Sequence, residues 1–132
     1  MARVVHFEIQ ADDVERAKQF YGAALGWRFE DWSGPAGGTT YWGILTGDAD
    51  QPGINGGLMP RPAPAPGPGQ GTNAYVCTVQ VDDYDATEAA IVAAGGVVAL
   101  PKMALAGMAW QGYYLDTEGN TFGIHQPDPE AR

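Results

Sequence analysis

The sequence has one cysteine and few cations. Seven lysine and arginine residues stand against sixteen aspartate and glutamate residues, for a formal net charge of −9. Cys77 cannot form an internal disulfide, and its place in an apolar strand pattern predicts a small buried thiol rather than a nucleophile. Scattered cations give no positive surface for phosphates or anionic lipids. We therefore expect neither nucleic acid nor a membrane as a partner.

Long apolar runs are also missing. No stretch approaches the ~20 apolar residues of a membrane-spanning helix, and the N-terminus "MARVVHFEIQ" lacks the apolar core of a signal peptide. A cytoplasmic location is the resulting expectation. The two histidines come with no recognisable nucleophile motif, so no Ser–His–Asp arrangement is indicated. The 132 residues, 45% of them hydrophobic, are enough for one folded domain with one core.

The first half of the chain predicts a strand, a helix and three more strands. "VVHFEIQ" alternates and is rich in β-branched and aromatic residues, which is typical of a strand. Asp12, with Glu15 three residues later, indicates a helix start, and Gly26 suits the left-handed residue that ends a helix. "WRFEDW", "TYWGILTG" and "GINGGLM" then predict short strands separated by turns.

The same pattern returns about seventy positions later. "IQADD" at 9–13 corresponds to "VQVDD" at 79–83. The second copy predicts a strand in "AYVCTVQV", a helix from about Asp83 to Ala94, and strands in "GGVVAL", "MAWQGYYLD" and "TFGIHQ". A Pro/Gly linker at 60–71 separates the copies. We thus expect one domain over 1–132, with module 1 at about 1–59 and module 2 at about 72–127.

Two motifs carry a resemblance to a known family. The stretch "DDVERAKQFYGAALGW" after the first strand, the linker, and the closing "DTEGNTFGIHQ" resemble the vicinal oxygen chelate superfamily, which includes glyoxalase I, bleomycin resistance proteins and extradiol dioxygenases. The chain is most similar to its small glyoxalase-like bacterial members. The resemblance implies an α+β fold in which two tandem βαβββ modules curl their mixed sheets around a central cavity, with the helices on the outer faces.

The resemblance also implies where a divalent metal would bind, and most of those positions lack a ligand. Metal-dependent members carry ligands on the first and last strands of each module. His6 matches one such position, but Val76, Gly57 and Gly123 occupy the others. We therefore expect no metal cofactor at the usual place. The alternative is a displaced site of His6, Glu8 and His125, which share strand parity and would suit Zn, Ni, Mn or Fe.

Strand alternation selects the other candidates for the cavity. If Phe7 and Ile9 face the helix, then His6 and Glu8 face the cavity. Aromatic walls with a few polar anchors are typical of small-molecule sites. The candidate ligand-binding residues are His6, Glu8, Trp42, Asn55, Thr78, Trp110, Tyr113 and His125, with Gln80 and Tyr114 as further cavity residues.

Two functions remain open at this stage. The first is binding of a small, partly aromatic or planar molecule in the cavity, with the usual metal site degenerate. The second is a metal-dependent lyase, isomerase or dioxygenase-like enzyme, with His6, Glu8 and His125 as candidate catalytic residues. In either case we expect a homodimer, because small domains with exposed sheet edges tend to associate.

Overall fold

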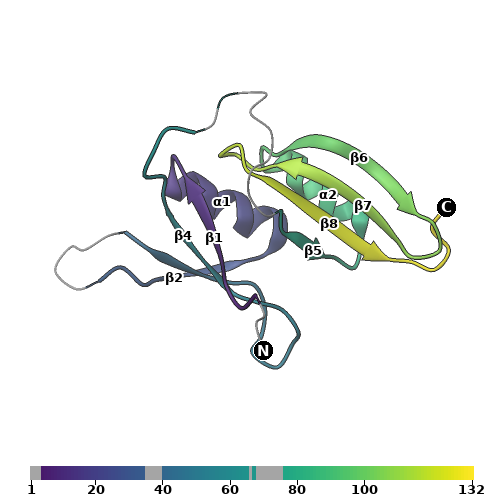
Figure 1. The fold of residues 1–132 in the computed structure, drawn as a ribbon, viewed down its shortest axis with the longest axis horizontal. Coiled ribbons are helices and arrows are strands. Elements are labelled where there is room, and N and C mark those ends of the chain that lie inside the picture. The colour runs from purple at the N-terminus through teal and green to yellow at the C-terminus, as the bar shows by residue number, and fades with distance from the viewer. Residues whose placement is uncertain (1–3, 35–39, 66, 68–75) are drawn as a thin grey trace.

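The structure is a computed structural model that describes residues 4–34, 40–65, 67 and 76–132. Ten elements follow one another as two copies of βαβββ, which confirms the predicted repeat (Figure 1). The first copy contains β1 (Phe7–Ala11), α1 (Val14–Leu25), β2 (Arg28–Asp31), β3 (Trp42–Leu45) and β4 (Gly56–Pro60). The second contains β5 (Thr78–Gln80), α2 (Tyr84–Ala93), β6 (Val97–Leu105), β7 (Ala109–Leu115) and β8 (Thr121–Pro127).

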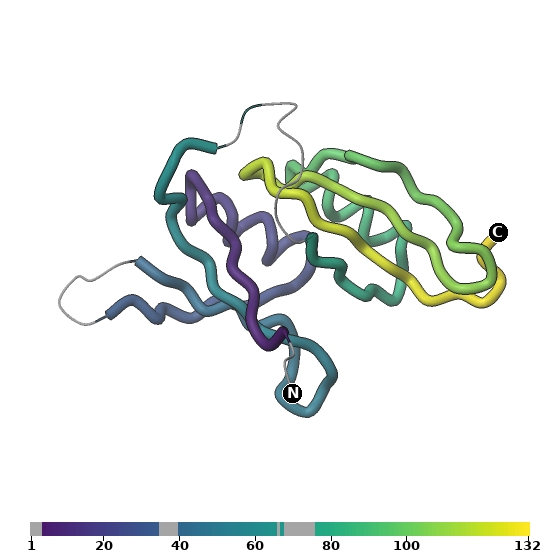
Figure 2. Tube along the Cα trace, in the orientation of Figure 1, coloured from purple at the N-terminus to yellow at the C-terminus, as the bar shows by residue number. Residues whose placement is uncertain are grey.

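Each copy folds into its own four-stranded mixed sheet. Sheet A has the order β1-β4-β3-β2, and sheet B has the equivalent order β5-β8-β7-β6. In both, the first strand pairs in parallel with the last, and the remaining pairs are antiparallel. The two modules lie side by side along the long axis of the molecule, module 1 in purple to teal and module 2 in green to yellow (Figure 2).

Helix α1 begins one residue later than the capping signal predicts. The side chain of Asp13, not Asp12, accepts a hydrogen bond from the backbone N–H of Arg16. Asp12 forms an ion pair with Arg61, at 3.1 Å, just after β4. Gly26 ends the helix with a φ of 71°, as predicted, because only glycine adopts this backbone conformation without steric cost. Helix α2 is capped equivalently by Asp83.

The two modules share one hydrophobic core but do not close around a cavity. Side chains of α1, α2, β7 and β8 form a joint cluster, in which Phe20, Tyr84, Tyr114 and Ile124 are buried. A smaller cluster under sheet A contains Ala17, Ile44 and Leu58. The helices therefore pack on each other and on one face of each sheet, which leaves the opposite faces uncovered. In the described part of the chain, the predicted central cavity is thus not enclosed.

A polar cluster clasps α1 to the turn between β7 and β8. Glu118 accepts hydrogen bonds from the guanidinium of Arg16, at 2.7 and 2.9 Å, and from the backbone N–H of Asp13, at 2.9 Å. Burial alone raises the pKa of Glu118, but these bonds and one from Thr117 outweigh it and lower the pKa to about 2. The hydroxyl of Tyr21 donates to Asp116 at 2.6 Å. These contacts fix module 1 against module 2.

The structure contradicts one expectation from the sequence, on Cys77, and bears on two others. Cys77 is exposed rather than buried, because the short edge strand β5 begins only after it. Of the linker at 60–71, residues 66 and 68–71 lie outside the described residues, and Pro60 belongs to β4. In the parts of the chain that the structure describes, neither helix combines the length and apolar content needed to cross a bilayer.

Candidate functional site

Strand β1 and the residue before it present Glu8 and His6 on the uncovered face of sheet A. Phe7 and Ile9 pack against the cluster beneath the sheet, together with Ala11. The side chains between them point the other way because residues alternate across a strand. The side chains of His6 and Glu8 are 44% and 45% exposed. The alternation predicted for this strand is confirmed.

Tyr41 joins these two side chains. Its hydroxyl donates to the carboxylate of Glu8 at 2.8 Å and lies 2.9 Å from Nε2 of His6. The direct distance from His6 Nε2 to Glu8 Oε2 is 4.0 Å. Burial first, and then the hydrogen bond and the charge of Glu8, raise the pKa of the Tyr41 hydroxyl above its ordinary value. Tyr41 therefore stays protonated between a histidine and a carboxylate.

Two aromatic rings cover two neighbouring glycines on the same face. Gly43 in β3 and Gly57 in β4 are register partners. A Cβ on Gly43 would overlap the Trp32 ring, and one on Gly57 would overlap Tyr41. The two rings are nearly parallel, with an angle of 13° and centroids 6.4 Å apart. Glycine in a strand allows this close approach. Trp32 is 46% exposed, so the pair forms an accessible aromatic surface.

The uncovered face of sheet B is built from neutral polar groups. Thr78 pairs in register with Gly123, and Gln80 with His125. Nδ1 of His125 lies 2.8 Å from Oε1 of Gln111, which is buried. A Cβ on Gly123 would lie about equally close to the side chains of Gln111, Thr78 and Tyr113, so these groups share one face. Thr78 and Tyr113 thus lie on the face predicted for them.

The edge strand β6 adds apolar side chains to this face. Leu100 is in register with Tyr113, and Leu105 with Ala109. Leu100 is 46% exposed, and Val97, opposite Leu115, is 56% exposed. Few single-chain surfaces leave a row of large aliphatic residues uncovered on an edge strand without a reason. The face of sheet B therefore combines a polar centre with an apolar edge.

The structure places Trp42 and Trp110 on the helix-covered faces, contrary to the predicted orientation. Trp42 is in register with the buried Leu58, and the ammonium of Lys18 from α1 lies 3.4 Å from its ring centroid. Trp110 packs against the joint core, and its indole N–H donates to Asp128 at 2.9 Å. Tyr114 is likewise buried in the joint core. The prediction assigned the wrong parity to these strand residues.

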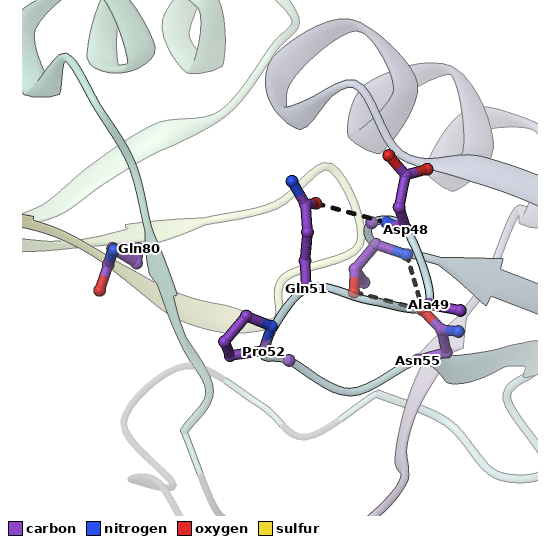
Figure 3. A pocket seen from close by; sticks show the side chains of 9 residues that line it. Asp48, Ala49, Gln51, Pro52, Asn55 and Gln80 are labelled. Carbon is purple, nitrogen blue, oxygen red and sulfur yellow. Dashed lines mark hydrogen bonds between the residues drawn. The ribbon is translucent and has the colours of Figure 1, made fainter.

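Asn55 lines a different feature, a groove of about 750 Å³ beside the loop between β3 and β4. Its carboxamide oxygen accepts from the backbone N–H of Thr46 at 2.9 Å. Figure 3 shows Gln80, from the strand of the other module, across the groove from this loop. The groove is lined by Thr46, Gly47, Asp48, Ala49, Gln51, Pro52, Gly53, Asn55 and Gln80, and it does not include the aromatic pair of Trp32 and Tyr41.

The predicted site residues thus fall into separate groups. His6 and Glu8 lie together on sheet A, while Thr78, Tyr113 and His125 lie on sheet B. Among the described residues, no three histidine, cysteine, aspartate or glutamate side chains stand close enough to hold a metal ion. Sequence reasoning missed Trp32, Tyr41 and Gln111. The strand glycines at 43 and 57 were a usable signal, because a glycine within a strand often marks a place where another group approaches the backbone closely.

The paired βαβββ modules define the class of this protein, and comparisons with known proteins agree. The family model described as "Bleomycin resistance protein-like N-terminal" matches residues 3–33. The candidate glyoxylase CFP32 of Mycobacterium tuberculosis is 31% identical over 126 residues, which cover 90% of this chain and 43% of that protein. This chain belongs to the glyoxalase/bleomycin resistance superfamily, the vicinal oxygen chelate superfamily. It spans less than half the length of the curated relatives it matches.

Solved structures show the same fold over nearly the whole chain. TnmS3, an antibiotic binding protein from Streptomyces sp. CB03234, is 27% identical with a TM-score of 0.69, and the match covers 97% of this chain and 98% of that one. A glyoxalase/bleomycin resistance protein/dioxygenase family enzyme from Burkholderia phytofirmans is 18% identical with a TM-score of 0.72, over 95% and 98% of the two chains. At that identity, the second likeness concerns the fold alone.

Proposed function

We propose that this protein binds a small molecule with a planar, partly aromatic body, and that the binding needs no metal. The observation that carries the proposal is the aromatic pair of Trp32 and Tyr41. Both rings lie over glycines on the uncovered face of sheet A, and nearly half of Trp32 is exposed. Offset stacking on such rings is favourable for any flat conjugated molecule. The antibiotic-binding relative TnmS3 supports a binding role.

Polar groups beside the rings would orient the ligand. Glu8 and, in the tautomer with its hydrogen on Nε2, Nδ1 of His6 offer acceptors next to Tyr41, and Glu30 accepts from the indole N–H of Trp32 at 3.2 Å. A ligand with amino groups or a positive charge at one edge of its ring would therefore suit this side. The negative net charge of the protein, −9, also favours a positively charged ligand.

The structure gives less support to catalysis. The alternative enzyme needed His6, Glu8 and His125 to act as one displaced site. His125 instead lies on sheet B, with its Nδ1 beside Gln111, while His6 and Glu8 are joined through Tyr41. Without a shared site, these residues give no reaction centre that we can name. Binding is therefore the function proposed.

A homodimer belongs to the same proposal. In one chain both uncovered faces are open, and the outer strands are β1 and β2 in sheet A and β5 and β6 in sheet B. A second copy could cover the apolar edge of β6 and turn open faces into walls of a cavity. Light scattering at micromolar concentration should give twice the mass of the chain. A monomer there would contradict this part of the proposal.

Fluorescence titration with proflavine, a flat cation with two amino groups, tests the ligand class. The wild type should bind it saturably, and Trp32→Ala should weaken binding by roughly tenfold or more, which corresponds to the loss of one stacking partner. Trp110→Phe is the matched control, because Trp110 packs into the core. Equal affinity of the wild type and Trp32→Ala would contradict the site, and absence of saturation by any planar aromatic compound in a wider panel would contradict the function.

A further inference from the structure

The metal that the family resemblance implies does not fit the residues of this chain. A catalytic divalent site needs three or four protein donors that converge on one point. Among the described residues of sheet A, His6 and Glu8 are donors 4.0 Å apart with no third histidine, cysteine, aspartate or glutamate grouped with them, and the last-strand position opposite Glu8 is Gly57. Two donors that lie two residues apart on one extended segment do not make such a site. The space between these two side chains is filled by another group of the chain.

The hydroxyl of Tyr41 occupies that space. The three atoms nearest to a Cβ built on Gly57 all belong to Tyr41, and the first of them is its hydroxyl oxygen. Any side chain projecting from position 57 would therefore meet this hydroxyl. The same oxygen is within hydrogen-bond distance of both His6 and Glu8. Tyr41 thus lies where a third ligand from β4 would have to enter.

The direction of the hydrogen bonds removes a second requirement for metal binding. A tyrosine hydroxyl has one proton, and here it is donated to Glu8 at 2.8 Å. The bond of 2.9 Å to His6 must then be donated by the imidazole, so Nε2 carries a hydrogen. A ring nitrogen that carries a hydrogen has no lone pair for a metal. A cation at this point would have to break both bonds.

In module 2 the corresponding last-strand position is also a glycine covered by a side chain from the neighbouring strand. Gly123 corresponds to Gly57. Their register partners are Tyr113 in β7 and Gly43 in β3. Gln111 and Tyr41 each lie two residues before these partners, so Gln111 corresponds to Tyr41. The carboxamide of Gln111 lies 3.0 Å from a Cβ on Gly123, and its oxygen lies 2.8 Å from His125. In both modules a side chain from the neighbouring strand covers the glycine and holds a histidine.

We infer that Tyr41, together with the absence of a ligand at Gly57, keeps divalent metals out of module 1. It does so by filling the space above Gly57 and by holding His6 and Glu8 in hydrogen bonds. Replacing Tyr41 with a small residue and supplying a carboxylate at position 57 should therefore create a site of His6, Glu8 and the new glutamate. Imidazole and carboxylate donors suit nickel and zinc.

Calorimetric titration of tag-free protein with nickel(II) alone tests this inference. The variant Tyr41→Ala/Gly57→Glu should bind one equivalent at least about tenfold more tightly than the wild type. Adding His6→Ala should return the affinity to the wild-type level, whereas adding His125→Ala, the matched histidine of module 2, should leave the gain in place. Circular dichroism checks that each variant folds.

If the double variant does not fold, the wild type and Tyr41→Ala decide the question. In the wild type, long-range ¹H–¹⁵N spectra of His6 should show the hydrogen on Nε2, and nickel(II) should not broaden its signals selectively. In Tyr41→Ala, nickel(II) should broaden them. Selective binding of nickel(II) at His6 of the wild type, a hydrogen on Nδ1, or no gain in any folded variant would overturn the inference. None of these results depends on proflavine binding.

Discussion

The uncovered faces of the two modules share one backbone plan and differ in chemistry. On sheet A, Glu8 lies opposite Gly57, and on sheet B, Thr78 lies opposite Gly123 in the same register. The space above the glycine holds the ring of Tyr41 in the first case and the carboxamide of Gln111 in the second. The first face therefore offers aromatic rings and a carboxylate, and the second offers neutral hydrogen-bonding groups.

This difference shows which features a duplication preserves. Strand pairing, the N-terminal aspartate caps of the helices and the covered glycines recur, because each depends on backbone geometry and on a core that both modules must build. The side chains on the uncovered faces support no core, and they have become unlike. A ligand held between two such faces would meet one aromatic, acidic wall and one neutral wall, so the pair would favour a ligand with two chemically different sides.

The largest effect should come from removing Glu118, whose bonds to Arg16 and Asp13 (the clasp) fix the two modules relative to each other. We expect Glu118→Ala to lower the free energy of unfolding by about 3–4 kcal/mol, because it removes a buried carboxylate that holds Arg16 and the N–H of Asp13. Urea denaturation followed by circular dichroism measures the change.

Glu130→Ala is the matched control for the clasp. Glu130 is exposed and lies 3.9 Å from Arg132 in an exposed ion pair. Such pairs contribute less than about 1 kcal/mol, so this variant should remain close to the wild type. If both variants unfold at the same urea concentration as the wild type, the clasp does not hold the modules together.

The next effect is an acid sensitivity that arises from the same carboxylate. The pKa of Glu118 in the folded protein is about 2, below its ordinary value of 4.5. Its contribution is therefore complete above about pH 4.5 and is lost as the pH falls toward 2, by about 2–3 kcal/mol. Melting temperatures measured from pH 6 to pH 2 should fall more steeply for the wild type than for Glu118→Gln. Parallel curves would contradict the assignment.

Sequence reasoning was sufficient where structure depends on local patterns. The strand alternation of β1, the glycine that ends α1 and the repeat at 79–83 each follow from residue types at short spacing, and the structure confirms them. The start of α1 was wrong by one residue because Asp12 and Asp13 are both good caps. Local sequence cannot show that Arg61, from a distant strand end, pairs with Asp12.

The errors concern residues whose surroundings come from elsewhere in the chain. Trp42 was assigned to the cavity because it is aromatic, yet its orientation follows from its register with Leu58 and its contact with Lys18 of α1. Trp32 and Tyr41 fall within the predicted strands "WRFEDW" and "TYWGILTG", but in the structure they lie just outside β2 and β3. Their positions over Gly43 and Gly57 depend on strand pairing, which the sequence does not specify to one residue.

The smallest effect should distinguish the histidines of the two faces. His6→Ala should weaken proflavine binding by about 1–3 kcal/mol, because the ligand loses an acceptor and Tyr41 loses a hydrogen bond. His125→Ala, which removes the equivalent contact with Gln111 on the neutral face, should change the affinity less. Calorimetry measures both affinities, and thermal melting should show both variants folded, since His6 is exposed and His125 only half-buried. Equal losses from the two substitutions would mean that the two faces contribute alike, and that the aromatic, acidic wall does not set the orientation of the ligand.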